Sequence, residues 1–401
     1  MSEELLSRVT GFIYPNELEI HWSILIVVYP YITGLVAGAF ILASLVKVFN
    51  VKEVQPTYRL SLLTALAFLL VAPLPLQLHL GHPERAFEIF LTPNLSSAMA
   101  MFGFVYAWYL MAVLLLEVWF EYRRDLVVWS REATTRMKWL YRLLSLFSND
   151  ISERAVHFDK AAVKIVTIIG IPSAFLLHGY VGFIFGSVKA NPWWSSVLMP
   201  IVFLMSAIVS GIALVIVLYM VLTPLRNAVI NMSCLDKIAS YLFYAVIVDF
   251  SLEALDFIHR LYESEESIRI LGTLITEKLL ISLFVIQILL GMIIPAGILV
   301  AVKSFWFNAE LRKLLYFVSA ILIQVGIFST RWNIVIGGQL FSKSFRGLTT
   351  YKMEIVGIEG LATALGLLVL PFIVLAVLLK VLPPWRDAEL QPETASGGIT
   401  V

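Results

Sequence analysis

The feature that most constrains the fold is a series of long apolar runs that follow one another along almost the whole chain. A helix needs about 20 mostly apolar residues to cross a bilayer. Small residues in "TGLVAGAF" and "SAIVSGIAL" predict close helix packing. The sequence therefore predicts an all-α integral membrane protein, a single transmembrane domain over residues 1–384. About nine spans are expected near 22–49, 58–80, 97–120, 161–185, 195–222, 238–258, 279–302, 314–336 and 355–382.

Composition supports the membrane assignment and removes several classes of site. Of 401 residues, 60% are hydrophobic and 14% are charged, whereas the surface of a soluble domain is about a quarter or more charged. One cysteine, Cys234, is too few for an internal disulfide, an iron–sulfur cluster or covalent haem attachment. We see no metal-ligand set and no basic run, so we expect a lipid bilayer around the chain and no nucleic-acid partner.

The charges between the apolar runs predict the orientation. Most of the 29 Lys and Arg residues fall in the connections from odd to even spans and at the C-terminal end, with the largest share between Arg123 and Lys164. Positive loops stay in the cytoplasm, which predicts a cytoplasmic (inner) membrane protein with its N-terminus outside and its C-terminus inside. Residues 123–150 are expected to form a cytoplasmic amphipathic segment, and residues 385–401 a disordered tail.

Under this topology, ionisable residues gather near the outer face. Asp249, Glu253 and Asp256 are spaced four and three residues apart, which puts them on one face of the sixth helix. Because buried carboxylates are costly in lipid, this face is expected to look inward. We prefer a proton pathway, with a structural hydrogen-bond network as the alternative. Candidate polar neighbours on the seventh and eighth spans are Gln287 and Gln324.

Histidines, carboxylates and aromatic residues just below one membrane face suit a quinone. Its two carbonyls need hydrogen-bond donors, its ring needs an apolar slot, and its redox change exchanges two protons, which suits histidine. In "LHLGHPERAFEIF", His79 is still within reach of such a site at the end of the second span. Arg85, in the same stretch, and Arg331, at the end of the eighth span, are interpreted as structural or partner-docking residues.

Four stretches resemble one family. "HLGHPERAF" resembles the "LG-basic-P-x-R" signature, and "HWSILIVVYPYITGLVAGAF" the opening helix, of the polysulfide-reductase-like membrane subunits of the NrfD/PsrC family. The stretches from "PSAFLLHGY" to "SAIVSG" and from "TRWNIVIGG" to "LPP" are similar to its longer branch, which includes DsrP of the DsrMKJOP complex and the membrane subunit of hydrogenase-2. The likeness extends from about Trp22 to Pro384.

The resemblance implies two four-helix bundles with the ninth helix as an addition, non-covalent menaquinone near the outer face, and no haem or iron–sulfur cluster in this chain. The family's quinone-binding histidine falls on His21. Its asparagine falls on Glu17, and an ionised glutamate only accepts hydrogen bonds, whereas asparagine also donates. Its tyrosine late in the fourth core helix corresponds to His178 or Tyr180.

These features predict the quinone-reactive membrane subunit of a multi-subunit respiratory oxidoreductase complex, not a complete enzyme by itself. It would exchange electrons between menaquinone and an extracytoplasmic, ferredoxin-like iron–sulfur subunit, with coupled proton transfer, in sulfur-compound metabolism. A multihaem cytochrome c and further membrane and catalytic subunits are expected partners. Two alternatives remain at this point, a di-histidine cytochrome b with His21, His79 and His178 as candidate ligands, and a proton-coupled transporter.

Overall fold

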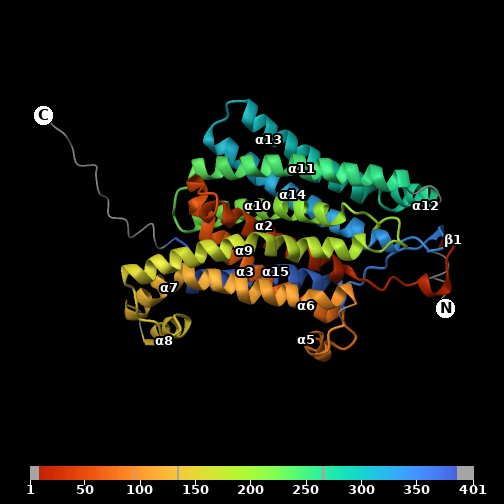
Figure 1. The fold of residues 1–401 in the computed structure, drawn as a ribbon. Helices are drawn as coiled ribbons and strands as arrows, with labels where there is room; N and C mark the ends of the chain where they lie inside the picture. Colours follow the sequence, from red (N-terminus) through yellow and green to blue (C-terminus); the bar gives the residue numbers. More distant parts are fainter. Residues whose placement is uncertain (1–8, 95, 133–134, 264–266, 386–401) are drawn as a thin grey trace.

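The computed structural model describes residues 9–94, 96–132, 135–263 and 267–385, so all but the first residue of the tail predicted at 385–401 lies outside it. Within these ranges, nine helical segments are long and apolar enough to cross a membrane. Figure 1 shows them side by side with their long axes roughly aligned. This arrangement confirms the all-α membrane fold expected from the apolar runs.

Several of the nine segments contain more than one helical element. In chain order they are α2 (Ile24–Lys47), η2–α3–α4 (Lys52–Thr57, Tyr58–Val71, Leu74–His79), α6–η4–α7 (Ala98–Trp108, Tyr109–Leu114, Leu115–Glu132), α9 (Glu153–Gly186), α10 (Met199–Leu225), α11 (Met232–Glu263), η6–α13 (Leu280–Ile293, Ile294–Ser304), α14 (Ala309–Val335) and α15 (Leu361–Val381). The connecting elements are β1 (Thr10–Phe12), η1 (Pro15–Glu17), η3 (Pro83–Arg85), α5 (Glu88–Leu91), α8 (Thr135–Leu144), α12 (Ile268–Thr273), η5 (Leu274–Lys278), η7 (Gly337–Gln339) and β2 (Arg346–Leu348).

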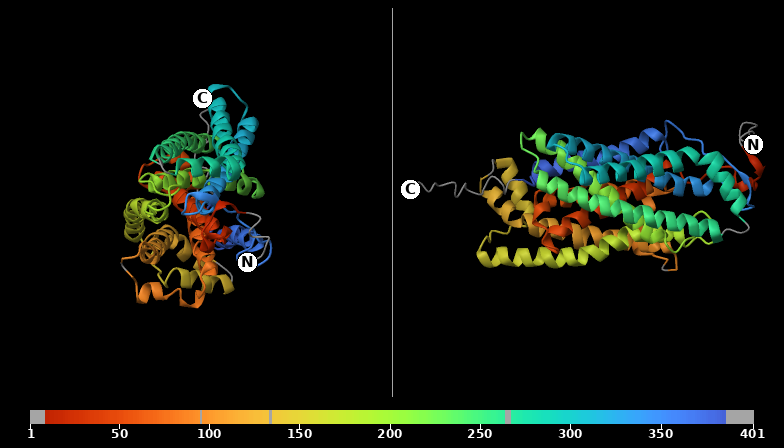
Figure 2. Two further views of the ribbon diagram at one scale, coloured as in Figure 1. Left: turned by 90° about the vertical axis from the view of Figure 1, so that its right-hand side faces the viewer. Right: turned by 90° about the horizontal axis from the view of Figure 1, so that it is seen from above.

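The helices pack as two groups of four with one addition. In the first bundle, α2 packs against α3 and α9, and α9 packs against α7. In the second bundle, α10 packs against α11 and α14, and α14 packs against η6 and α13. Contacts of α10 with α2 and α9, and of α14 with α2, join the two bundles, and α15 lies against α3 and α2 on the first bundle. The left view of Figure 2 shows the helices from the end of the molecule, with the part of the chain around α13 and α14 on the opposite side from α6 and α7.

Glycines allow the closest helix crossings. A Cβ atom on Gly38 of α2 would lie 2.7 Å from the Cα of Gly211 on α10, and one on Gly291 of η6 would collide with the Cα of Gly326 on α14. Backbones approach this closely only where side chains are absent, a common device in membrane helix packing. The small residues of "TGLVAGAF" and "SAIVSGIAL" therefore form the contact between the bundles, as their composition predicts.

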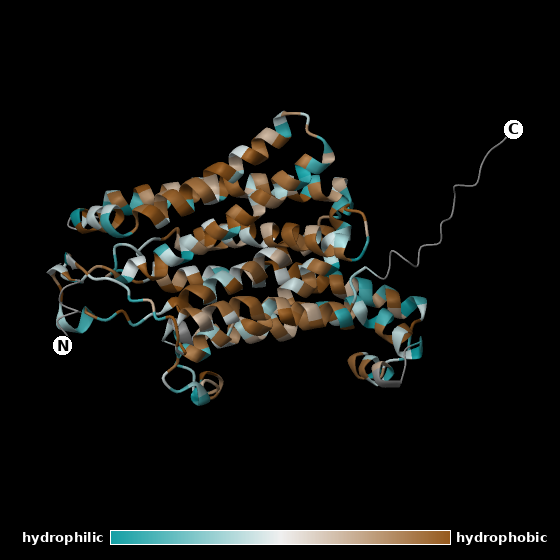
Figure 3. Cartoon of the chain, turned by 180° about the vertical axis from the view of Figure 1, so that it is seen from behind, coloured by the Kyte–Doolittle hydropathy of each residue, from teal (hydrophilic) through white to brown (hydrophobic). Residues whose placement is uncertain are grey.

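Helix boundaries differ from the expected spans in two places. The second span breaks between Val71 and Leu74, at Pro73, because proline cannot donate the helical hydrogen bond. The third span continues to Glu132 rather than ending near residue 120, so the segment expected at 123–150 is divided between α7 and the separate helix α8. Figure 3 shows hydrophilic residues at both ends of the helical body and apolar residues along its length.

The end of the molecule that holds β1 is covered by chain segments distant in sequence. Strand β1 pairs antiparallel with β2. The backbone amide of Trp22 donates to Gln339 Oε1 at 3.1 Å, and that of Ile24 donates to the hydroxyl of Tyr351 at 3.1 Å. The segment between α14 and α15 therefore caps the start of α2, where several predicted site residues lie.

Candidate functional site

A fully buried arginine lies at the centre of the largest polar group in the second bundle. Arg331 on α14 donates from Nη2 to Ser206 Oγ at 2.5 Å, and its guanidinium carbon lies 4.2 Å from the ring centre of Phe203. Its Nε and Nη1 atoms have no hydrogen-bond partner among the described residues. The sequence suggests a structural or docking role at a helix end, but the structure places Arg331 inside the protein with two donors unused.

His178 on α9 lies beside this arginine and is also fully buried. Its Nε2 lies 3.3 Å from Arg331 Nη2, and its Nδ1 lies 3.3 Å from the hydroxyl of Thr33 on α2. Because arginine can only donate, Nε2 of His178 must accept the hydrogen bond from Arg331. The hydroxyl of Thr33 already donates to the carbonyl of Tyr29 at 3.0 Å, so it accepts from Nδ1 of His178. These partners select a neutral imidazole with its proton on Nδ1.

Two of the three predicted carboxylates join the same group. Asp249 is 2% exposed, and both it and Glu253 interact electrostatically with Arg331. Glu253 Oε2 accepts a hydrogen bond from Gln287 Nε2 at 2.8 Å, which confirms Gln287 as a neighbour. Asp249 Oδ1 and Glu253 Oε1 are buried without a partner in the described part of the chain. Opposite charges with unused hydrogen-bonding capacity thus face one another inside the second bundle.

Asp256, the third carboxylate, has a different environment. Its Oδ2 lies 2.6 Å from Arg260 Nη2, and its Oδ1 accepts a hydrogen bond from Ser196. Arg260 also stacks over the ring of Trp193, 4.9 Å from its centre, and donates to the carbonyl of the same residue. Asp256 therefore fixes the α9–α10 connection to α11, which corresponds to the structural alternative considered for this face. Gln324 also lies elsewhere, with Tyr31 and the carbonyl of Ser210.

Three tyrosines form a second polar group in the first bundle. The phenol groups of Tyr106 on α6 and Tyr180 on α9 lie in the surroundings of Tyr29 on α2. Tyr106 donates to the carbonyl of Leu69 at 2.6 Å, whereas the buried hydroxyls of Tyr29 and Tyr180 have no partner among the residues described. His178 and Tyr180, which are alternatives by sequence, therefore belong to different groups. Sequence reasoning misses Tyr29 because an aromatic residue in an apolar helix carries no signal of its own.

The remaining predicted residues are spread over the covered end. His21 is exposed just before α2. Glu17 accepts hydrogen bonds from the hydroxyl of Ser342 and the backbone amide of Lys343. His79 Nδ1 lies 3.1 Å from Glu359 Oε1. The exposed Arg85 donates from Nε to Oε1 of Glu88 at 2.9 Å.

The positions of the histidines bear on the cytochrome alternative. His178 is enclosed by α2, α9 and α14, whereas His21 and His79 lie at the covered end with partners of their own or exposed to solvent. Across the described part of the chain, no cluster of three or more histidine, cysteine or acidic side chains is arranged to hold a metal ion. Both ring nitrogens of His178 already face Thr33 and Arg331, so neither is available to an axial metal bond in this arrangement.

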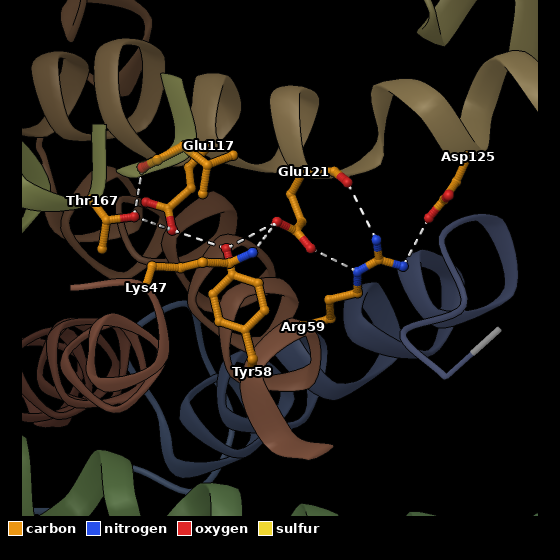
Figure 4. A network of polar contacts seen from close by, with 8 residues as sticks. Lys47, Tyr58, Arg59, Glu117, Glu121, Asp125 and Thr167 are labelled. Atoms are coloured by element: carbon orange, nitrogen blue, oxygen red, sulfur yellow. Dashed lines mark hydrogen bonds and ion pairs between the residues drawn. The ribbon is translucent and has the colours of Figure 1, made fainter. Parts of the chain in front are cut away.

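A buried ionic network near the other end of the first bundle is missed by the sequence reasoning (Figure 4). Glu117 on α7 is fully buried, and its Oε1 accepts hydrogen bonds from Thr167 at 2.9 Å and Tyr58 at 3.4 Å. Its only signal is a single glutamate within "LLLEVW". Because the third span is expected to end close by, the sequence does not distinguish Glu117 from an ordinary residue at a helix end.

The neighbouring charges of this network are paired. Glu121 Oε2 accepts from Lys47 Nζ at 2.7 Å and Glu121 Oε1 from Arg59 Nε at 3.0 Å, while Arg59 Nη1 lies 2.8 Å from Asp125 Oδ2. Close by on α7, Arg123 binds both oxygens of a further aspartate. Buried charges are retained when paired in this way, so the network joins α2, α3 and α7.

Comparison with known proteins identifies the family. The model of the family described as "Polysulphide reductase, NrfD" matches residues 15–343, which include the first eight spanning segments. The chain belongs to the NrfD family. Helix α15 follows the matched region, so the NrfD core of this chain consists of the two bundles, and the ninth helix is outside the match.

Two of the three curated relatives described below are named as reductase subunits. The chain is 30% identical over 325 residues to a selenate reductase subunit of Mesobacillus selenatarsenatis, covering 79% of this chain and 73% of the relative. It is 28% identical over 203 residues to a putative dimethyl sulfoxide reductase membrane subunit of Halobacterium salinarum, covering 49% and 42%. It is 25% identical over 199 residues to protein NrfD of Escherichia coli, covering 49% and 58%.

Proposed function

We propose that this chain is the quinone-reactive membrane subunit of a multi-subunit oxidoreductase complex. The membership in the NrfD family and the reductase names of its relatives support this role. The observation that carries the quinone assignment is the pair of buried hydroxyls on Tyr29 and Tyr180, which have no partner among the described residues. Phenol groups donate hydrogen bonds to carbonyl oxygens, which are the polar atoms of a quinone.

The proposed binding site for menaquinone lies at the covered end of the first bundle. Tyr29 and Tyr180 would donate to the quinone carbonyls. His21, at the start of α2, would hold a carbonyl or exchange a proton nearer the surface. Glu17 and His79, which already have partners in Ser342 and Glu359, would line the approach. Aromatic packing between Tyr29 and Phe102 supplies apolar walls for the ring, with ring centres 5.3 Å apart.

Reduction of a quinone to a quinol takes up two electrons and two protons, and oxidation releases them. Electrons would pass to or from an iron–sulfur subunit docked at the covered end, near the exposed Arg85. Protons would use the buried group of His178, Arg331, Asp249 and Glu253. Asp249 and Glu253 each have an oxygen with no hydrogen-bond partner among the described residues, and this oxygen can accept a proton. The positive charge of Arg331 stabilises the ionised forms of both carboxylates.

The surroundings proposed for this subunit follow the charge distribution. The covered end would face the outside of the cytoplasmic membrane, with the basic α7–α8 end inside. A ferredoxin-like iron–sulfur subunit, a multihaem cytochrome c and further catalytic subunits would complete the assembly. The proposed terminal substrate of the complex is a compound from sulfur metabolism, as in complexes containing DsrP, or a related oxyanion.

The test uses the intact complex and a short-chain menaquinol as substrate. Replacement of both tyrosines by phenylalanine (Tyr29→Phe with Tyr180→Phe) should raise KM about tenfold, since each lost hydrogen bond is worth roughly 0.5–1.5 kcal/mol. The matched control is Tyr262→Phe, at a tyrosine that is 85% exposed on α11. Unchanged KM and unchanged inhibitor binding in the double variant would refute the assignment of this site. Loss of activity in the control as well would mean that the assay reports a general defect.

A further inference from the structure

A cavity lies in the second bundle. It has a volume of about 300 Å³ and lies between α11, η6 and α14, beneath the connection that carries Trp193. Phe250 and Phe284 line it and are 39% and 42% exposed on the outside of the helical body. Because this surface faces lipid in a membrane protein, the cavity opens sideways to the bilayer. Its size is at the lower end of the range found for small-molecule sites.

The wall formed by η6 has an unusual helical geometry. Leu280–Ile293 is a π-helix of 14 residues, whereas π-helices are rare, mostly single turns, and frequent at functional sites. This segment contributes Gln287 to the cavity together with apolar side chains. The remainder of the lining is mainly apolar, so a ligand must be largely hydrophobic.

A directed hydrogen-bond chain forms the polar part of the cavity. Asn333 Nδ2 donates to Gln287 Oε1 at 2.8 Å, and Gln287 Nε2 donates to Glu253 Oε2 at 2.8 Å. An ionised carboxylate only accepts, which fixes the orientation of Gln287 and then that of Asn333. As a result, Asn333 Oδ1 and Glu253 Oε1 have no donor among the described residues. Asn333 is 1% exposed.

The two unpartnered oxygens select the ligand's chemistry. Both accept hydrogen bonds, so a ligand that brings O–H donors removes the cost of leaving them unpaired. An acyl chain brings no donor, and the phosphate of a phospholipid headgroup brings negative charge and further acceptors next to a carboxylate. The carbonyl oxygens of an oxidised quinone are acceptors as well. A hydroxylated aromatic ring on a lipophilic chain satisfies both the apolar walls and the acceptor pair.

We propose that this cavity is a second, lipid-accessible binding site that takes a lipophilic hydroxylated aromatic molecule of the quinol class in its reduced form. It is built from α11, η6 and α14, and shares no residue with the proposed quinone site between α2 and α9. Of the residues proposed for proton transfer it includes only Glu253, so it extends beyond the proposed function and does not depend on the tyrosine site.

The experiment measures equilibrium binding of radiolabelled menaquinol with a short isoprenoid chain to the full-length protein in lipid nanodiscs, under reducing conditions. Two sites per chain are expected. Ala254→Trp, which fills the cavity, should remove one site. The matched control Leu255→Trp, at the adjacent residue that is 56% exposed, should retain both. The double tyrosine variant should weaken binding about tenfold at the other site only, so the two proposals can fail separately.

A second variant tests the role of the acceptor pair and guards against a folding defect in Ala254→Trp. Asn333→Leu has nearly the same size and removes one free acceptor. It should weaken menaquinol binding at this site about tenfold, with little change for the oxidised menaquinone. Failure of Ala254→Trp to remove any menaquinol site, or equal affinity for the two oxidation states at the site that it removes, would overturn the proposal. A phospholipid retained in the wild type and lost from Ala254→Trp, without any menaquinol binding, would also overturn it.

Discussion

Two buried arginines, one in each bundle, differ in how completely their charges are satisfied. Arg123 in the first bundle uses every donor group: Nε and Nη2 bind Asp159 at 2.8 and 2.6 Å, and Nη1 binds the carbonyl of Asp150 at 2.6 Å. Arg331 in the second bundle uses only Nη2 among the described residues, and its carboxylate neighbours have an unpartnered oxygen each. An arginine whose donors are all paired holds helices together, whereas a buried arginine and carboxylates with unused hydrogen-bonding atoms can bind protons or water without first breaking a contact.

The largest effect is expected at Arg331. Arg331→Leu removes the positive charge that acts on Asp249 and Glu253, and it removes the hydrogen bond to Ser206. Quinol turnover in the intact complex should fall by roughly 10²-fold or more, as for loss of a proton-transfer group. Arg331→Lys keeps the charge and should recover part of the turnover. Wild-type turnover in Arg331→Leu would remove this group from the proton route.

The converse expectation holds for Arg123. Arg123→Leu leaves Asp159 buried and unpaired, so the free energy of unfolding should fall by about 3–5 kcal/mol. Turnover per assembled complex should stay close to that of the wild type. Thermal unfolding in detergent and activity normalised to assembled complex measure the two quantities separately. A turnover loss equal to that of Arg331→Leu would abolish the contrast between the two bundles.

A smaller contrast is expected within α11. Asp249→Asn keeps the shape of the side chain, and Oδ1 of Asp249 has no partner among the described residues, so we expect little change in stability. Turnover should fall about 10- to 100-fold, which is the range for loss of a hydrogen bond to a charged group. Asp256→Asn weakens the pair with Arg260 and should lower the thermal midpoint more than the turnover. The two isosteric variants are compared in the same complex, and the reverse pattern would exchange the roles of the two aspartates.

The smallest effect is expected at the exposed pair of Arg85 and Glu88. The hydrogen bond from Arg85 lowers the pKa of Glu88 in the folded protein. Any stabilisation of the folded state by this pair is therefore present above the pKa of Glu88 in the unfolded chain, about 4.3. It is lost as the pH falls through the pKa of Glu88 in the folded protein. Exposed pairs are weak, so Arg85→Ala should leave the thermal midpoint at pH 7 almost unchanged. Any small difference in thermal midpoint between Arg85→Ala and the wild type should disappear as the pH is lowered through the pKa of Glu88 in the folded protein. A difference that grows on acidification would contradict this sign.

The family motifs and apolar runs predict most of the fold because hydrophobic length and small-residue spacing are local properties. The nine spans found in the described ranges, the close contact at Gly38 and Gly211, and the inward position of Asp249 and Asp256 all follow from local patterns. The end of the third span does not follow from a local pattern. Glu117 and the charged residues after it are tolerated in α7 only because side chains on other helices pair with them.

The sequence by itself determined that this chain is a helical membrane protein, where its spans lie and which family it resembles, because these depend on composition and order along the chain. Only the tertiary structure decided how its polar residues are grouped. It placed His178 with Arg331, Tyr180 with Tyr29, and Asp256 with Arg260. Such pairings depend on helix rotation and depth, which are set by packing between segments far apart in sequence.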